Sequence, residues 1–174
     1  ALHPDFTYNL FKMNNEYYIA VEDLTETVAL KINKNCKIEI IKKFKGNQLK
    51  NILCFHPFLE RKSKVINGNF VTVDTGSGCV HIAPGHGEDD YIAGKEYGLP
   101  TISPVDNMGR FTSEFEIMKG ENVFKSNPKI IELLKEKSVL IGEPENIEHS
   151  YPHCWRCKKP IIFRATYQWF LKIE

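Results

Sequence analysis

Short apolar runs, each broken by turn-forming residues, are the feature that most constrains the fold of this chain. Residues 7–12 and 16–21 alternate apolar and polar side chains on either side of Asn14-Asn15, so we expect a β-hairpin there. The alternation returns at 36–44, which predicts a half-buried strand. Since the runs are brief, the strands must be short and closely spaced.

Further short strands are expected along the chain. The Asn67-Gly68 pair is a strong signal for a two-residue hairpin turn between two of them. The runs that predict these strands lie at 52–55, 64–66, 70–73, 79–82 and 139–141.

About three helices interrupt the strands. Residues 22–33 carry an apolar residue at every fourth position, and 89–97 form a short segment closed by Gly98. The clearest helix is expected at 130–137, where Pro128 precedes an apolar stripe. Strands with inserted helices predict an α+β domain, with the short strands in a β-barrel-like arrangement.

Composition excludes several classes of protein. The 174 residues are 42% hydrophobic and 26% charged, which is typical of a soluble globular chain. No apolar run approaches the roughly 18 to 20 residues of a membrane helix, and no signal peptide opens the sequence. Five scattered cysteines fit a reducing compartment, so a cytoplasmic location is expected. The first residue is not Met, which indicates a piece of a longer chain.

Charge is unevenly distributed although the net charge is only +1. Residues 31–64 hold ten Lys and Arg against two acids, and 149–174 hold five against one. Residues 81–148 hold seven against thirteen. Basic regions on both sides of an acidic middle are compatible with a polyanion partner. Charge alone, however, favours a solvated lysine-rich surface.

The densest group of chemically capable residues lies at 74–91. Four glycines allow close approach of the backbone, and the layout is a strand, a glycine loop and a helix start, where free N–H groups face a ligand. The pattern is not a dinucleotide fingerprint, because a third glycine is missing. The loop also holds two imidazoles and three acids: His81, His86, Glu88, Asp89 and Asp90.

Three chemistries are open for this loop. Cys79 could act as a nucleophile with His81, but a two-residue separation along a strand is about 6.5–7 Å, too long for direct proton transfer. His81, His86 and Asp90 could bind a metal, although their spacing matches no recognised zinc pattern. The third chemistry is a site that positions a labile substrate and a water, with a carboxylate holding an ammonium group.

The same loop carries a family resemblance. Residues 76–91, followed by Gly98-Leu99 and Pro104, resemble the signature of the editing domain inserted in isoleucyl-tRNA synthetases, and Pro84-Gly-His-Gly87 is the isoleucyl form of the loop. The resemblance covers essentially the whole chain. It includes Pro4-Asp5-Phe6, His56-Pro57-Phe58, Asn122-Val-Phe124, 150–157, 160–165 and 168–170.

The resemblance implies an ester hydrolase. The editing domain of this family removes valine wrongly attached to the isoleucine tRNA, without a cofactor of its own, while the catalytic body of the parent enzyme uses ATP and Mg. A second site is needed because one methylene is worth only about 1–3 kcal/mol; isoleucyl-tRNA synthetase is itself the known example, with about 150-fold discrimination. The implied partners are the isoleucine tRNA, valine and the catalytic body, with no membrane.

The resemblance also implies roles for single residues. The carboxylate of Asp90 would hold the substrate ammonium, and His81 would face the small side chain as a gate; these two are the candidate catalytic residues. The loop between His81 and Asp90 would line the pocket near the terminal adenosine of the tRNA. Its implied substrate-binding residues are Ala83, Gly85, His86 and Gly87. A threonine-rich strand that completes the family's pocket would precede the start of this chain.

A change in composition near Glu148 predicts a boundary between an editing domain at 1–148 and a basic, aromatic return segment at 149–174 that leads toward the catalytic body. The return segment contains one C-x-x-C pair, Cys154 and Cys157. Structural zinc takes four ligands, so this pair would be half of a zinc site in the full-length protein. The alternative function is a non-catalytic RNA-binding module with a zinc knuckle built on the pair.

Overall fold

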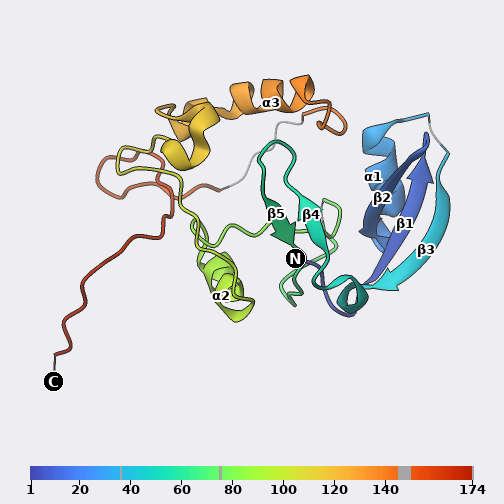
Figure 1. Cartoon of the computed structure of the whole chain (residues 1–174), viewed down its shortest axis with the longest axis horizontal. Coiled ribbons are helices and arrows are strands. Elements are labelled where there is room, and N and C mark those ends of the chain that lie inside the picture. Colours follow the sequence, from blue (N-terminus) through green and yellow to red (C-terminus); the bar gives the residue numbers. More distant parts are fainter. Residues whose placement is uncertain (36, 75, 145–149, 174) are drawn as a thin grey trace. The chain divides into compact units, whose positions relative to one another are not determined.

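The computed structural model describes residues 1–35, 37–74, 76–144 and 150–173 (Figure 1). Contacts divide the chain into two compact units. Unit 1 comprises Ala1–His81 and Lys129–Glu145, and unit 2 comprises Ile82–Pro128 and Asn146–Glu174. The predicted domain boundary at 148/149 lies outside the described residues. The two units are described separately below.

Unit 1 contains a three-stranded antiparallel sheet in the order β2-β1-β3. The predicted hairpin is confirmed: β1 (Thr7–Met13) and β2 (Glu16–Val21) are adjacent antiparallel strands. Asn14 and Asn15 join them with φ angles of +49° and +69°. Asparagine tolerates this left-handed region better than most residues, which is why the turn forms here.

The third strand departs from its prediction. β3 (Glu39–Lys45) begins later than the predicted 36–44, of which residue 36 lies outside the described residues. Almost every residue of β3 is exposed, so the prediction of a half-buried strand was wrong. The register with β1 shifts between Leu10 and Phe11, and both Ile40 and Ile41 remain exposed. Alternation was a poor guide because β3 is an edge strand of which only Phe44 is partly buried, against the core cluster that contains Tyr8.

The first helix packs on the core of unit 1. A 3₁₀ turn at Glu22–Leu24 leads into α1 (Thr25–Ile32), which confirms the predicted helix at 22–33. Thr25 links the helix start to the sheet, since its hydroxyl donates to the Val21 carbonyl oxygen at 3.0 Å and accepts from the Asn9 side chain. The core has two clusters of buried residues: Leu2, Tyr8, Val21 and Leu49 in one, and Phe11, Met13, Ala20 and Ala29 in the other.

A second small sheet in unit 1 is the hairpin of β4 (Leu53–Phe55) and β5 (Lys62–Lys64). The predicted strand at 52–55 is therefore confirmed, whereas the one at 64–66 lies two residues too late. A 3₁₀ turn at Gly46–Leu49 precedes this hairpin.

The predicted hairpin at Asn67-Gly68 was wrong. The Asn67 side chain donates to the carbonyl oxygens of Leu2 and Gly46, and the Gly68 N–H donates to Leu2. These groups hold the first residues of the chain, so they are not available to a hairpin turn. The predicted strands at 70–73, 79–82 and 139–141 form no regular strand; Cys79 makes a single bridge with Leu2.

Unit 2 contains α2 (Glu88–Glu96), which confirms the predicted helix at 89–97. Gly98, with φ of +64°, ends it as expected, and the Leu99 N–H donates to the Gly94 carbonyl oxygen at 2.8 Å. Two 3₁₀ segments follow, at Ser113–Met118 and Val123–Lys125.

The last helix, α3 (Asn127–Glu136), confirms the predicted helix at 130–137 and begins earlier, next to Pro128. The described residues thus form an α+β structure with three α-helices and two small antiparallel sheets. They contain no closed barrel, so the barrel-like arrangement stays a prediction. None of the helices in the described part of the chain is long and apolar enough to span a membrane.

Candidate functional site

The glycine loop of unit 2, residues 83–87, is closed by a hydrogen bond to the side chain of Asp90. The Ala83 N–H donates to Asp90 Oδ2 at 3.1 Å, across seven residues. The His86 N–H donates to the Ala83 carbonyl oxygen at 2.8 Å, which forms a turn inside this loop. Asp90 is half-buried in the first turn of α2, whereas its neighbour Asp89 is exposed. Of the three adjacent acids in the first turn of α2, Asp90 is therefore the one that holds the loop.

Two glycines make this packing feasible. A Cβ at Gly85 would lie 1.9 Å from the Ile102 carbonyl oxygen, and a Cβ at Gly87 would lie 2.8 Å from Asp90 Oδ2. Neither glycine has a positive φ, so close approach of neighbouring atoms explains both residues. Gly85 lets the loop reach the backbone beside it, and Gly87 leaves room for the Asp90 carboxylate.

The return segment lies alongside the same loop. His86 Nδ1 is 3.0 Å from the Phe163 carbonyl oxygen, and the Ala165 N–H donates to the Gly85 carbonyl oxygen at 2.8 Å. Arg164 Nη1 donates to the Val105 carbonyl oxygen at 2.6 Å. Within unit 2, two residues of the predicted return segment, Phe163 and Ala165, thus contact the loop.

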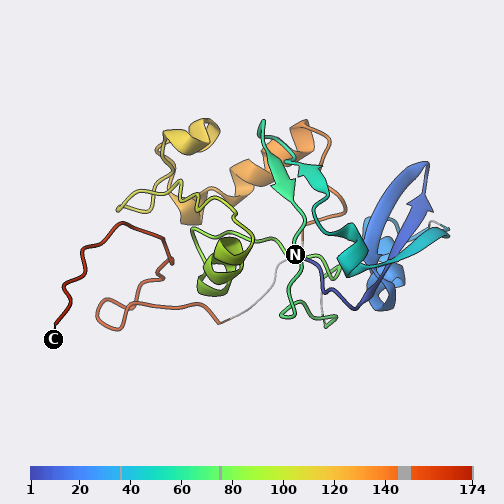
Figure 2. The same cartoon turned by 60° about the horizontal axis from the view of Figure 1, so that its bottom comes forward.

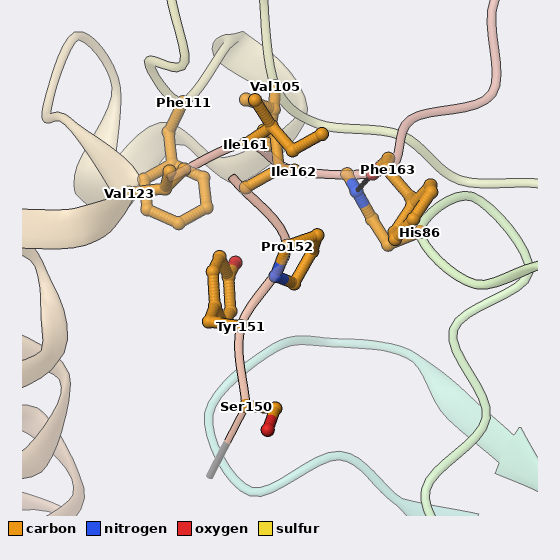
Figure 3. Close-up of a pocket in the computed structure, with 10 residues that line it drawn as sticks. All are labelled: His86, Val105, Phe111, Val123, Ser150, Tyr151, Pro152, Ile161, Ile162 and Phe163. Carbon is orange, nitrogen blue, oxygen red and sulfur yellow. Dashed lines mark hydrogen bonds between the residues drawn. The ribbon is translucent and has the colours of Figure 1, made fainter. Parts of the chain in front are cut away.

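A cavity of about 520 Å³ opens in unit 2 (Figure 3). Of the predicted substrate-binding residues, only His86 lines it. The other lining residues, most of them apolar, were not predicted: Val105, Phe111, Val123, Ser150, Tyr151, Pro152, Ile161, Ile162 and Phe163. Val123 begins a short 3₁₀ turn and the others lie outside the regular helices and strands, so no periodic signal marked them in the sequence.

His81 is exposed and is the last residue of the first stretch of unit 1. The chain before it is tied to the core by Tyr8, whose hydroxyl donates to the Gly78 carbonyl oxygen at 2.8 Å and accepts from the His3 N–H at 2.9 Å. Burial raises the pKa of Tyr8. The Val80 N–H donates to the Ala1 carbonyl oxygen at 3.0 Å, which fixes the backbone one residue before His81.

A further imidazole of unit 1 belongs to His56. His56 Nδ1 accepts hydrogen bonds from the N–H groups of Phe58 and Leu59, at 3.3 and 3.1 Å. Desolvation lowers the pKa of His56, and the positive charge of Arg61 lowers it further. Because Nδ1 accepts both hydrogen bonds, the ring proton of this tautomer lies on Nε2. His56 belongs to the motif His56-Pro57-Phe58 that carried the family resemblance, which implied no role for it.

His81 and Asp90 lie in different units, so their meeting in one pocket stays a prediction. The two alternative chemistries, a cysteine nucleophile and a metal site, have less support. Desolvation raises the pKa of the Cys79 thiol, the opposite of what a nucleophile needs. The described ranges contain no cluster of three or more His, Cys, Asp or Glu side chains that could hold a metal ion.

Cys154 and Cys157 lie in a tight turn. The Cys154 N–H donates to the Lys159 carbonyl oxygen, and the Lys158 N–H donates to that of Cys154, both at 2.8 Å. Hydrogen bonds from the backbone N–H groups of Cys157 and Arg156, and from the Cys157 thiol, lower the pKa of Cys154. This arrangement favours a thiolate, the form that binds zinc, but two thiols are half of a structural set.

The comparisons with known proteins identify the family of this chain. The family model described as "Leucyl-tRNA synthetase, editing domain" matches residues 7–133. This range contains the glycine loop, α2, His81 and Asp90. The chain therefore belongs to the editing-domain family of aminoacyl-tRNA synthetases.

The similar proteins are isoleucine–tRNA ligases. The chain is 47% identical to an isoleucine–tRNA ligase of Syntrophomonas wolfei, 49% to one of Thermotoga neapolitana and 51% to one of Staphylococcus saprophyticus. Each match covers 100% of this chain and 19% of the relative. The resemblance to isoleucyl-tRNA synthetase is thus confirmed, and nothing supports the alternative of an RNA-binding zinc-knuckle module. The chain spans about a fifth of the length of these relatives.

Proposed function

We propose that this chain hydrolyses valine wrongly esterified to the isoleucine tRNA. Whole-chain similarity to isoleucine–tRNA ligases supports this substrate, and the match to an editing-domain family supports the reaction. The aminoacyl ester lies beside a free ribose hydroxyl and is already labile. The protein then needs to position the ester and a water, and it needs no covalent nucleophile.

The observation that carries the proposal is the state of the Asp90 carboxylate. Its Oδ2 accepts one hydrogen bond from Ala83, and Oδ1 has no partner in the part of the chain that the structure describes. A carboxylate fixed through one oxygen can accept a charge-assisted hydrogen bond from an ammonium group through the other. Asp90 would in this way hold the α-ammonium of the aminoacyl end and fix the ester in place.

His81 would then set the size limit of the pocket. Its ring would face the amino-acid side chain, leaving room for valine and excluding the extra methylene of isoleucine. Ala83, Gly85, His86 and Gly87 would border the terminal adenosine. The barrel-like closure of the short strands, including a threonine-rich strand from outside this chain, would complete the walls.

The partners follow from this role. The isoleucine tRNA brings the substrate, and the catalytic body of the synthetase, which uses ATP and Mg, supplies the aminoacylated end. Cys154 and Cys157 would contribute two of four zinc ligands in the longer protein, where zinc would hold the return segment to that body. A cytoplasmic location fits the same role.

Deacylation assays test the proposal. The full-length protein that carries this chain should release valine from isoleucine tRNA and spare isoleucine. His81→Ala should enlarge the pocket, so that correctly charged tRNA also loses its isoleucine. If valyl-tRNA is as stable with the protein as without it, the proposed reaction is wrong. If His81→Ala still fully spares isoleucyl-tRNA, His81 is not the gate.

A further inference from the structure

The β4–β5 hairpin presents an unusual face in unit 1. Its register pairs Leu53 with Lys64, Cys54 with Ser63 and Phe55 with Lys62. Directly opposite residues of an antiparallel pair point to the same side of the sheet. One side of the hairpin therefore carries what we call the basic–aromatic face: Leu53, Phe55, Lys62 and Lys64.

The basic–aromatic face is open. The side chain of Phe55 is 82% exposed and that of Leu53 is 55% exposed. Lys62 Nζ lies over the Phe55 ring, 5.5 Å from its centre, so one face of the ring carries a cation while the residue as a whole stays largely exposed. Figure 2 shows β4 and β5 as a hairpin apart from the three-stranded sheet of the same unit. A flat aromatic ring is thus available on a rigid strand pair.

The backbone of the hairpin is well defined beyond its two strands. The Val65 N–H donates to the Ile52 carbonyl oxygen at 2.8 Å, and the His56 N–H donates to the Arg61 carbonyl oxygen at 3.0 Å. The ladder therefore continues at both ends. This regularity fixes Phe55 and the two lysines relative to one another before any ligand arrives.

The charge of the hairpin is strongly positive. Residues 50–64 contain Lys50, Arg61, Lys62 and Lys64 against a single acid, Glu60. A face that combines an exposed aromatic ring with lysines matches what single-stranded nucleic acid requires, since rings stack on bases and cations contact phosphates. A docking face for protein would need few charges at its centre. Charge therefore favours RNA as the occupant.

The position of the hairpin agrees with such a ligand. Two residues after β5, the Ile66 carbonyl oxygen accepts a hydrogen bond from the Leu2 N–H at 2.9 Å, and Leu2 forms a bridge with Cys79. The hairpin thus adjoins the segment that leads to His81, the proposed gate. A tRNA end that brings its amino acid to His81 would pass this hairpin.

We propose that the basic–aromatic face binds the single-stranded 3′ end of the tRNA, with Phe55 stacked on a base and Lys62 and Lys64 contacting phosphates. This inference rests on the proposed function and adds to it the surface that receives the tRNA end. The partner is defined by its chemistry: an unpaired polynucleotide with accessible base faces and a negative backbone.

Binding measurements on the full-length protein test the stacking role. The probes are isoleucine tRNA with an intact 3′ end and the same tRNA without its last four nucleotides. Phe55→Ala should weaken binding of the intact tRNA about 5- to 100-fold and leave the shortened tRNA unaffected. Phe55→Trp should retain the affinity, because it keeps an aromatic face. Ser63→Ala, on the opposite side of the hairpin, is the matched control and should change nothing.

Salt dependence tests the phosphate contacts. Lys62→Ala and Lys64→Ala should each reduce the slope of log affinity against log salt by about 0.7, the value for one phosphate of a single strand. Phe55→Ala should leave that slope unchanged. Unaltered slopes in both lysine variants would contradict the phosphate contacts.

The proposal is overturned if Phe55→Ala binds intact tRNA as tightly as the wild type. It is also overturned if the variant loses the same affinity for intact and shortened tRNA, because the face would then serve another part of the tRNA or a protein partner. Valine release by the wild-type protein is recorded separately. Its absence would reject the proposed reaction, whereas the two binding results decide the role of the hairpin.

Discussion

His86 Nδ1 lies 3.0 Å from the backbone carbonyl oxygen of Phe163. This contact, with the Ala165–Gly85 hydrogen bond beside it, makes the return segment part of the glycine loop's own support in unit 2. The loop that Asp90 holds from α2 is thus also held by the return segment.

Replacement of His86 tests this support. His86→Ala should remove one hydrogen bond, worth about 0.5–1.5 kcal/mol. The return segment should then open more often, so limited proteolysis should cleave it faster than in the wild type. His153→Ala is the control, because its Nδ1 contacts only the Tyr151 carbonyl oxygen within its own turn. Equal cleavage rates in His86→Ala and the wild type would contradict the predicted support.

The two loop glycines should respond differently to alanine. Gly85→Ala places a methyl group against the Ile102 backbone, which cannot move cheaply, so stability should fall by about 1–3 kcal/mol. Gly87→Ala meets only the movable Asp90 carboxylate and should mainly displace it. Thermal unfolding and valine release, measured on both variants, should separate them. Full deacylation activity in Gly87→Ala would show that the position of Asp90 is unimportant.

Tyr8 should be the most sensitive polar residue in the core of unit 1. Tyr8→Phe leaves the Gly78 carbonyl oxygen and the His3 N–H without their partner, so unfolding free energy should fall by about 1–3 kcal/mol. Tyr17→Phe alters a ring that is 60% exposed and should change stability by less than about 0.5 kcal/mol. Denaturant unfolding measures both. Equal stabilities of the two variants would contradict the role of the Tyr8 hydroxyl.

His56 should make stability depend on pH. Its folded-state pKa is lowered, so the unfolded chain binds more protons between the two pKa values. The stability from neutral His56 is complete above the ordinary value of about 6.5 and is lost as the pH falls through the folded pKa. Titration of the His56 ring by NMR checks this directly. A pKa at or above the ordinary value would contradict the two N–H···Nδ1 bonds.

The sequence predicted local elements well where period and turn chemistry coincide. The β1–β2 hairpin was marked by alternation and by two asparagines suited to positive φ, and α2 by its acidic first turn and Gly98. Prediction from the sequence failed where contacts with distant backbone groups determine the local structure. Asn67 and Gly68 bind the start of the chain, a contact that no local pattern shows.

The candidate site was predictable in part for the same reason. The sequence marked Asp90 and its glycines, and the structure explains them through the bond to Ala83 and two close approaches. Phe163 and Ala165 could not be marked, because their contribution is a backbone carbonyl oxygen and a backbone N–H, which any residue offers. His56 was quoted only as part of a motif, since a pair of amide donors to a ring nitrogen depends on the turn geometry.

The most direct measurement is the rate of valine release from isoleucine tRNA by Asp90→Asn, beside Asp89→Asn as the control on the exposed neighbour. The amide of Asp90→Asn can still accept from Ala83 but carries no charge for an ammonium group, so the rate should fall about 10- to 100-fold. Asp89→Asn should release valine at the wild-type rate. Full activity in Asp90→Asn, with the fold intact, would contradict the anchor role on which the account depends.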